Sequence, residues 1–151
     1  MAFFTLITGA TGGLGSAFVR ECAKRGDNLI LTGTKANVLE SICQEIQNEF
    51  PNIKVICRTC DISSEAERAE FFNFLKSENK QINFLINNAG YIAEGEFLSH
   101  LDQEIMKIIR VNCEGTIDIT QKVIKARVES EPLHIVTVAS MAEVLKLALT
   151  K

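Results

Sequence analysis

A glycine-rich turn between an apolar run and a helical pattern limits the fold of this chain more than any other feature. The apolar run from Phe3 to Ile7 ends at Thr8, and a turn with Gly9, Gly13 and Gly15 at its fixed positions leads directly into an amphipathic pattern. This order predicts a strand, a tight turn and a helix whose first N–H groups can bind an anion such as a phosphate. Glycines there let the backbone approach a diphosphate closely. A strand-to-helix connection without any ligand is the alternative.

Four further apolar runs predict strands, and helical patterns separate them. The predicted strands after the first are 28–32, 53–57, 82–86 and 133–138. The predicted helices after the first are 36–50, one opened by the capping box Ser64 to Glu67, and a long one over 102–127. Near-continuous apolar strands that alternate with helices are typical of a parallel sheet covered on both faces. We therefore expect one α/β domain over residues 1–151, a doubly wound parallel sheet of about five strands.

Polar or turn-forming residues follow every predicted strand. They are Gly9 to Gly15, then Thr34 and Lys35, then Asp61, then Asn87 to Gly90, and finally Ser140. In such a sheet, ligands bind beyond the carboxyl ends of the strands, where the strand order reverses. The sequence thus predicts a single crevice that gathers these residues.

Composition excludes several classes of function. The net charge of -3 offers no basic surface for nucleic acid or an anionic membrane, and no apolar run is long enough to span a bilayer. Without a basic segment before the first apolar run, we expect no signal peptide and a cytoplasmic protein. The five cysteines suggest reduced thiols, although the spacing of Cys57 and Cys60 leaves a redox or zinc role as a weaker alternative. No metal site is expected.

Four motifs in order resemble the short-chain dehydrogenase/reductase family. These are the Thr-Gly-x-x-x-Gly-x-Gly turn, Asn87-Asn88-Ala89-Gly90, Val111-Asn112, and the run 135–140 that ends at Ser140. The resemblance implies a Rossmann-type fold and reversible hydride transfer between a nicotinamide cofactor and a small-molecule carbonyl or alcohol substrate. It implies cofactor binding by Gly9, Thr11, Gly13, Leu14, Gly15, Thr34, Lys35, Asp61, Ile62, Asn88, Ala89 and Gly90.

The resemblance also implies catalytic roles for Asn112 and Ser140. Ser140 would hydrogen-bond the substrate oxygen as charge develops on it. Asn112 shares an apolar helical stripe with Ile105 and Ile108, where an unpaired amide costs about 1–3 kcal/mol. In the family this asparagine marks a local helix distortion. The alternative is an amide satisfied by neighbouring backbone.

The residues after the second predicted strand bear on the choice between NADP and NAD. NAD-binding folds place an acidic residue there for the ribose 2′-OH, whereas a basic residue accommodates the 2′-phosphate. This chain has Gly33-Thr34-Lys35 and no acid. The sequence therefore favours NADP over NAD, unless Lys35 is only the solvated first turn of a helix.

The chain departs from the family in lacking the catalytic Tyr-x-x-x-Lys. Its one tyrosine, Tyr91, has no lysine four residues later, and Met141 to Thr150 resembles the loop that leads to the missing motif. We therefore expect a truncated, incomplete sheet with an exposed fifth strand, and no turnover by the 151 residues alone. A non-catalytic nucleotide-binding module or assembly partner is the alternative. The resemblance leaves a homo-oligomer open and does not identify the substrate.

Overall fold

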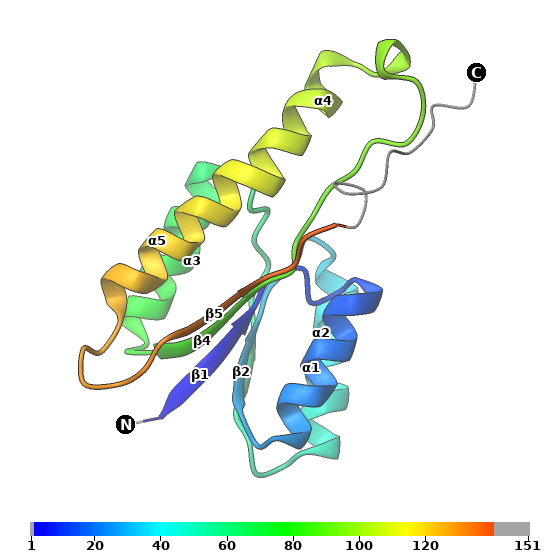
Figure 1. Ribbon diagram of the computed structural model, residues 1–151. Helices are drawn as coiled ribbons and strands as arrows, with labels where there is room; N and C mark the ends of the chain where they lie inside the picture. Colours follow the sequence, from blue (N-terminus) through cyan, green and yellow to red (C-terminus); the bar gives the residue numbers. More distant parts are fainter. Residues whose placement is uncertain (1, 141–151) are drawn as a thin grey trace.

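Five parallel strands form the centre of the molecule. The structure is a computed structural model that describes residues 2–140. The strands are β1 (Phe3–Ile7), β2 (Asn28–Leu31), β3 (Val55–Cys57), β4 (Gln81–Asn87) and β5 (His134–Thr137). Their order in the sheet is β3-β2-β1-β4-β5, and every neighbouring pair is parallel. The predicted doubly wound α/β fold is confirmed, and the strand order reverses between β1 and β4 (Figure 1).

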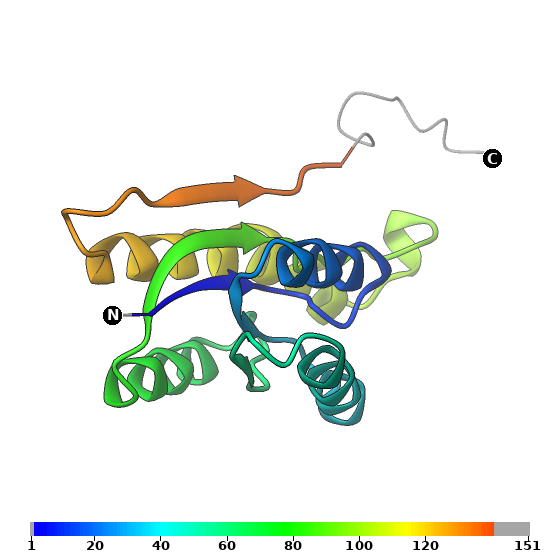
Figure 2. The ribbon, with the colours of Figure 1, turned by 90° about the horizontal axis from the view of Figure 1, so that it is seen from below.

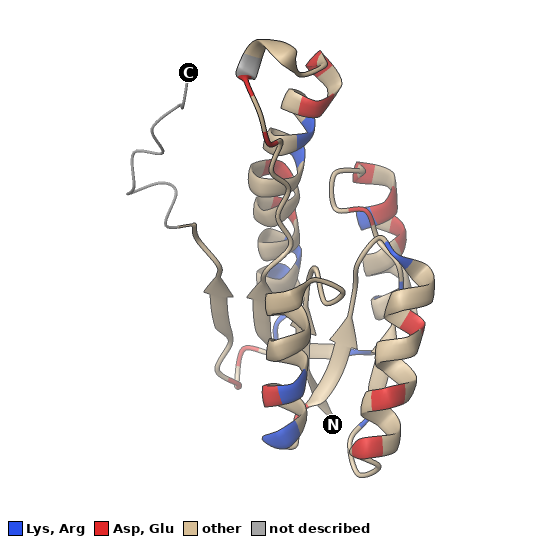
Figure 3. Cartoon of the chain, turned by 90° about the vertical axis from the view of Figure 1, so that its right-hand side faces the viewer, with Lys and Arg blue, Asp and Glu red and all other residues tan. Residues whose placement is uncertain are grey.

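Helices cover both faces of this sheet. Figure 2 shows α1 (Gly13–Lys24) and α2 (Ala36–Glu49) on one face, with α3 (Glu65–Ser77) and α5 (Thr116–Ala126) on the other. The strands contribute to both cores alternately: Leu6 of β1 packs with the α3 and α5 side chains, and its neighbour Ile7 packs with those of α1 and α2. Burial on both faces explains why the central strands β1 and β2 read as continuous apolar runs. In Figure 3 the charged residues lie mainly on the helices.

The predicted long helix over 102–127 is a succession of three segments. It begins as α4 (Asp102–Ile109), continues as the π-helical turn η2 (Arg110–Gly115), and ends as α5. A short 3₁₀ turn, η1 (Phe97–Ser99), precedes it. The π turn coincides with Asn112, the position where the family resemblance implied a local distortion. Such turns are frequent at functional sites.

β5 is the exposed edge of the sheet among residues 2–140. All four of its residues are exposed, including Ile135 and Val136. Within the described part of the chain its one partner is β4, in a register that places Leu85 beside Ile135. The expectation of an exposed fifth strand is therefore confirmed. Residues 141–151, which contain the predicted loop after Ser140, lie outside the described residues.

The helix α3 begins as the sequence predicts, with one change in the capping box. The Ser64 hydroxyl accepts a hydrogen bond from the Glu67 N–H at 3.3 Å. The Glu67 carboxylate, however, accepts from the N–H of Asp61 at 2.8 Å rather than from that of Ser64. The prediction of a reciprocal box was wrong in this half, because the preceding turn brings the Asp61 amide within reach. The carboxylate therefore holds the loop after β3 against the helix.

Candidate functional site

An open cavity of about 480 Å³ lies where the carboxyl ends of the strands meet. Most residues predicted to bind a cofactor line it: Gly9, Thr11, Gly13, Leu14, Gly15, Thr34, Asp61, Ile62, Asn88, Ala89 and Gly90. Lys35, Asn112 and Ser140 are not part of this lining. Parallel strands bring their carboxyl ends to one edge, so residues separated by 80 positions meet there.

Two glycines permit the close packing at the floor of this cavity. Gly9 has a φ of +65°, and a Cβ atom on it would lie 2.7 Å from the Ala89 Cα. A Cβ on Gly15 would lie 2.1 Å from the Gly9 carbonyl oxygen. Helix α1 therefore begins directly against the turn. Its N-cap residue is Gly12, which makes no side-chain cap, and its first turn contains no acidic residue. Bare backbone beside an uncapped helix N-terminus suits a phosphate group.

Hydrogen bonds join the ends of β1 and β4 under the cavity. The buried Thr8 hydroxyl accepts from the N–H groups of Asn88 at 3.1 Å and Ala89 at 3.0 Å. The Asn88 amide donates in return to the carbonyls of Thr8 at 3.1 Å and Gly9 at 3.0 Å. The turn after β1 and the turn after β4 therefore form one rigid unit.

Among the described residues that line the cavity, two are charged, Asp61 and Lys107. Asp61 accepts hydrogen bonds from the Ser63 hydroxyl at 2.7 Å and the Ser63 N–H at 2.9 Å. Burial opposes ionisation, but these bonds and the Lys107 charge hold the pKa of Asp61 below its usual value. Lys107 also lies 5.2 Å from the centre of the Tyr91 ring. An ionised acceptor and a cation thus face the same cavity.

Asn112 is satisfied by backbone, as the alternative interpretation proposed. Its side-chain oxygen accepts from the Tyr91 N–H at 2.8 Å, and its amide donates to the Tyr91 carbonyl at 2.8 Å. Ile105 and Ile108 of the predicted apolar stripe are half-buried, whereas Asn112 itself is exposed. Asn112 thus fixes a lining residue without lining the cavity.

Ser140 follows β5 and is exposed. The residue of that segment that reaches the cavity is Val138, whose N–H donates to the Asn87 carbonyl at 2.9 Å. Lys35 is likewise exposed, at the N-cap of α2, next to the lining residue Thr34. Both predicted residues therefore lie outside the lining, each within two positions of a residue that belongs to it.

Several lining residues were missed by reasoning from the sequence. They are Gly12, Gly33, Cys60, Tyr91, Lys107, Val111 and Val138. Gly33 stands at the end of a predicted strand. A Cβ atom on Gly33 would lie only 3.0 Å from the Thr11 hydroxyl oxygen, which explains why a residue without a side chain occupies this position. Lys107 belongs to no motif, and in the sequence only its position five residues before Asn112 relates it to the site.

The fold and the cavity are those of Rossmann-type proteins, and the comparisons with known proteins agree. The model of the short chain dehydrogenase family matches residues 4–150. A very-long-chain 3-oxoacyl-CoA reductase-like protein of Arabidopsis thaliana is 36% identical over 144 residues, covering 94% of this chain and 46% of the relative. A very-long-chain 3-oxoacyl-CoA reductase of Coccidioides immitis is 30% identical over 146 residues, covering 94% and 41%.

A solved structure gives the same result. A short-chain dehydrogenase from Sphingobium yanoikuyae in complex with NADPH matches with a TM-score of 0.86 and 26% identity, covering 96% of this chain and 56% of that one. This chain therefore belongs to the short-chain dehydrogenase family, a family of oxidoreductases. It spans about half the length of the relatives that it matches. Within residues 2–140, no helix combines the length and apolar character needed to cross a bilayer.

Proposed function

We propose that this chain supplies the nicotinamide-nucleotide site of an NADP-dependent oxidoreductase that acts on a carbonyl or alcohol. The bound cofactor would donate or accept the hydride. The observation that carries the proposal is the bare backbone of Gly9 and Gly15 packed beside the uncapped start of α1. Any side chain there would displace a diphosphate or the turn itself. The ionised Asp61 would accept a hydrogen bond from the adenine, beside Ile62.

The preference for NADP rests on the end of β2. Thr34 lines the cavity and Lys35 follows it at the N-cap of α2, with no acidic residue between Gly33 and Glu40. A cation here would pair with a 2′-phosphate, and a Thr hydroxyl would donate a hydrogen bond to it. The relative solved with NADPH supports this choice. NAD is the less favoured cofactor.

The catalytic part of the proposal concerns Asn112, Ser140 and the proton donor. Ser140 would orient the substrate oxygen, and Asn112 would hold the Tyr91 segment in place through its two hydrogen bonds. Tyr91 is the chain's only tyrosine, no lysine stands four residues after it, and the Lys107 ammonium lies 5.2 Å from the centre of its ring. Because the family's proton donor is a tyrosine with a lysine in that spacing, we infer that residues 1–151 form one nucleotide-binding domain that does not turn over alone.

Titration with NADPH and NADH tests the cofactor assignment. The purified 151-residue protein should bind NADPH more tightly than NADH, and Lys35→Ala should weaken NADPH binding by about tenfold while leaving NADH nearly unchanged. Lys54→Ala, an exposed lysine before β3 and outside the lining, is the matched control. If the protein binds neither NADPH nor NADH, the proposed function is refuted. If it binds NADH more tightly than NADPH, the preference for NADP is refuted.

A turnover assay separates the enzyme from its alternative, a non-catalytic nucleotide-binding module. NADPH oxidation should be measured by absorbance with a panel of aldehydes, ketones and a 3-oxoacyl thioester, the last because two relatives are named as 3-oxoacyl-CoA reductases. An intact mass must accompany the assay. Binding without turnover by a protein of the 151-residue mass supports our inference, and turnover by that same protein contradicts it.

A further inference from the structure

Arg68 is a buried arginine whose guanidinium joins three separate segments. The residue lies in α3 and is 2% exposed. Its Nη1 donates to the Ile62 carbonyl at 2.6 Å, its Nε to Asp118 at 2.6 Å, and its Nη2 to Glu114 at 2.8 Å. A buried cation requires such partners, and the fixed fork of a guanidinium holds them in one geometry. Although burial opposes it, hydrogen bonds from Lys122 and Arg68 hold the pKa of Asp118 below its usual value, so this carboxylate stays ionised at neutral pH.

The carbonyl held by Arg68 belongs to the cavity wall. Ile62 lines the cavity, and its carbonyl oxygen also lies against the bare Cα of Gly115, where a Cβ would be only 2.4 Å away. Gly115 and Glu114 are part of the π turn η2. Arg68 therefore links the loop after β3 to η2 through its bonds to the Ile62 carbonyl and the Glu114 carboxylate.

The π turn carries a second part of the same wall. Val111 of η2 lines the cavity, and Asn112 of η2 fixes the backbone of Tyr91, which also lines it. Without the guanidinium, the Ile62 carbonyl would face the Glu114 carboxylate with no donor between them, and Asp118 would keep only its bond from Lys122. Repulsion between the carbonyl dipole and the carboxylate would then favour a larger separation of η2 from the loop. Arg68 is therefore the group that bonds to both of these parts of the wall.

We propose that Arg68 is a positioning residue for nucleotide binding, which sets the distance between the Asp61–Ile62 loop and the η2 segment. It does not touch the cavity itself, since it is absent from the lining. The inference rests on the proposed function, in which Asp61 and Ile62 contact the adenine. Its effect should therefore fall on the adenine half of the cofactor and spare the nicotinamide half.

Binding measurements on fragments of the cofactor test this. We expect Arg68→Met to weaken NADPH and 2′,5′-ADP by about tenfold or more and reduced nicotinamide mononucleotide by less than about twofold. Arg68→Lys should restore part of the loss, because one ammonium cannot hold all three oxygens in the fork geometry. Arg20→Met is the matched control: Arg20 also pairs with two carboxylates, Glu45 and Glu49, but on the exposed face of α1.

Unchanged 2′,5′-ADP binding by folded Arg68→Met, or an equal loss for both halves of the cofactor, would overturn the proposal. If Arg68→Met does not fold, Arg68→Lys decides on the same criterion. If the unmodified chain binds no nucleotide, the proposed function fails. Amide hydrogen exchange then tests separately whether Arg68 positions the two segments. Faster exchange at Ser64 and Tyr91 in Arg68→Lys than in Arg20→Met would support its positioning role, because their N–H groups bond within the two joined segments. Equal exchange would overturn it.

Discussion

Replacing Gly15 by alanine tests the packing that shapes the candidate site. The new Cβ would lie 2.1 Å from the Gly9 carbonyl oxygen and 2.8 Å from the Asn88 amide nitrogen. That carbonyl cannot move cheaply, because it also accepts from the Gly12 N–H at 3.1 Å and from Asn88 at 3.0 Å. Overpacking of this kind costs about 1–3 kcal/mol, and alanine recovers about 1 kcal/mol of helix propensity. We expect a net loss of up to about 2 kcal/mol in the free energy of unfolding.

Gly13→Ala provides the matched control for this substitution. Gly13 lies in the same first turn of α1, and a Cβ there would meet no atom within 4 Å. The control should therefore keep its stability or gain up to about 1 kcal/mol. Urea unfolding followed by circular dichroism measures both variants. A Gly15→Ala variant as stable as Gly13→Ala would show that the turn and helix do not pack as described, and the argument for a phosphate cradle would fall with it.

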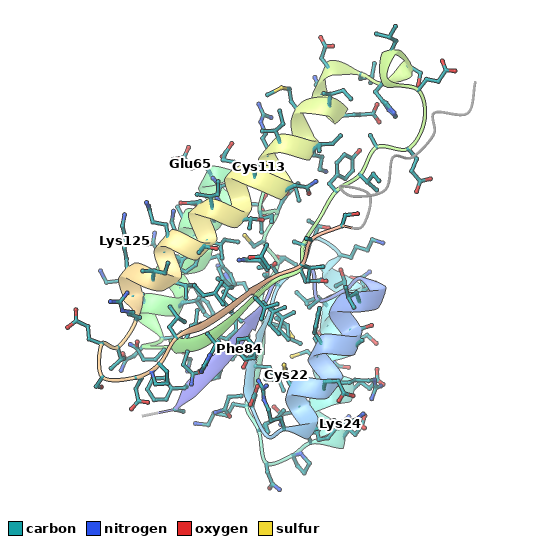
Figure 4. All side chains as sticks on the ribbon, in the orientation of Figure 1. Cys22, Lys24, Glu65, Phe84, Cys113 and Lys125 are labelled. Atoms are coloured by element: carbon teal, nitrogen blue, oxygen red, sulfur yellow. The ribbon has the colours of Figure 1, made fainter. Side chains whose placement is uncertain are left out.

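Three further predictions concern single side chains. Thr8→Val removes the acceptor for two N–H groups and should lower the free energy of unfolding by about 1–3 kcal/mol; an unchanged urea midpoint would contradict this. Ser64→Ala removes the N-cap of α3 and should cost about 1 kcal/mol in the same assay, and no loss would argue against the cap. Burial raises the pKa of the Cys60 thiol to about 11, so its thiolate at pH 8 is about a hundredfold rarer than for an ordinary cysteine. Iodoacetamide should therefore modify the exposed Cys113 (Figure 4) before Cys60, and the labelling of Cys60 should increase as the pH rises. Peptide mass spectrometry measures both rates, and equal rates at pH 8 would refute the prediction.

The sequence predicted burial better than it predicted strand pairing. The run from Phe3 to Ile7 has the predicted bounds, because a continuous apolar run stops at a glycine turn. The strand predicted from Ile53 begins only at Val55, although Ile53 is buried. The Ile53 N–H bonds to the Phe50 carbonyl, and the Lys54 N–H bonds to the Asn28 side chain. The hydrophobic pattern indicates that Ile53 is buried, but it does not indicate which acceptors the backbone N–H groups of this segment bond to.

Reasoning from the sequence located the site through its backbone motifs and missed residues that reach it by tertiary packing. Glycines and asparagines at strand ends are recognisable, because only certain residues tolerate those turns. Lys107 and Arg68 lie on ordinary amphipathic helices, where a charge is usually solvated. Lys107 of α4 lines the cavity near Asp61, and Arg68 of α3 bonds to the Ile62 carbonyl, so both positions follow from how these helices meet the loop after β3. That meeting is a property of the three-dimensional packing and leaves no local pattern.

The π turn also determines how this region tolerates changes in length. A π turn holds one residue more than an α turn, so Arg110–Gly115 carries one residue that a regular helix would not need to join α4 to α5. Deleting one residue there would let the backbone relax into a regular helix. The two helices would keep their relative phase, and the change would fall on the backbone around Asn112, whose side chain holds Tyr91. A one-residue deletion is therefore absorbed locally within this short window, whereas the same deletion in the regular helix α4 would rotate everything before it by about 100°.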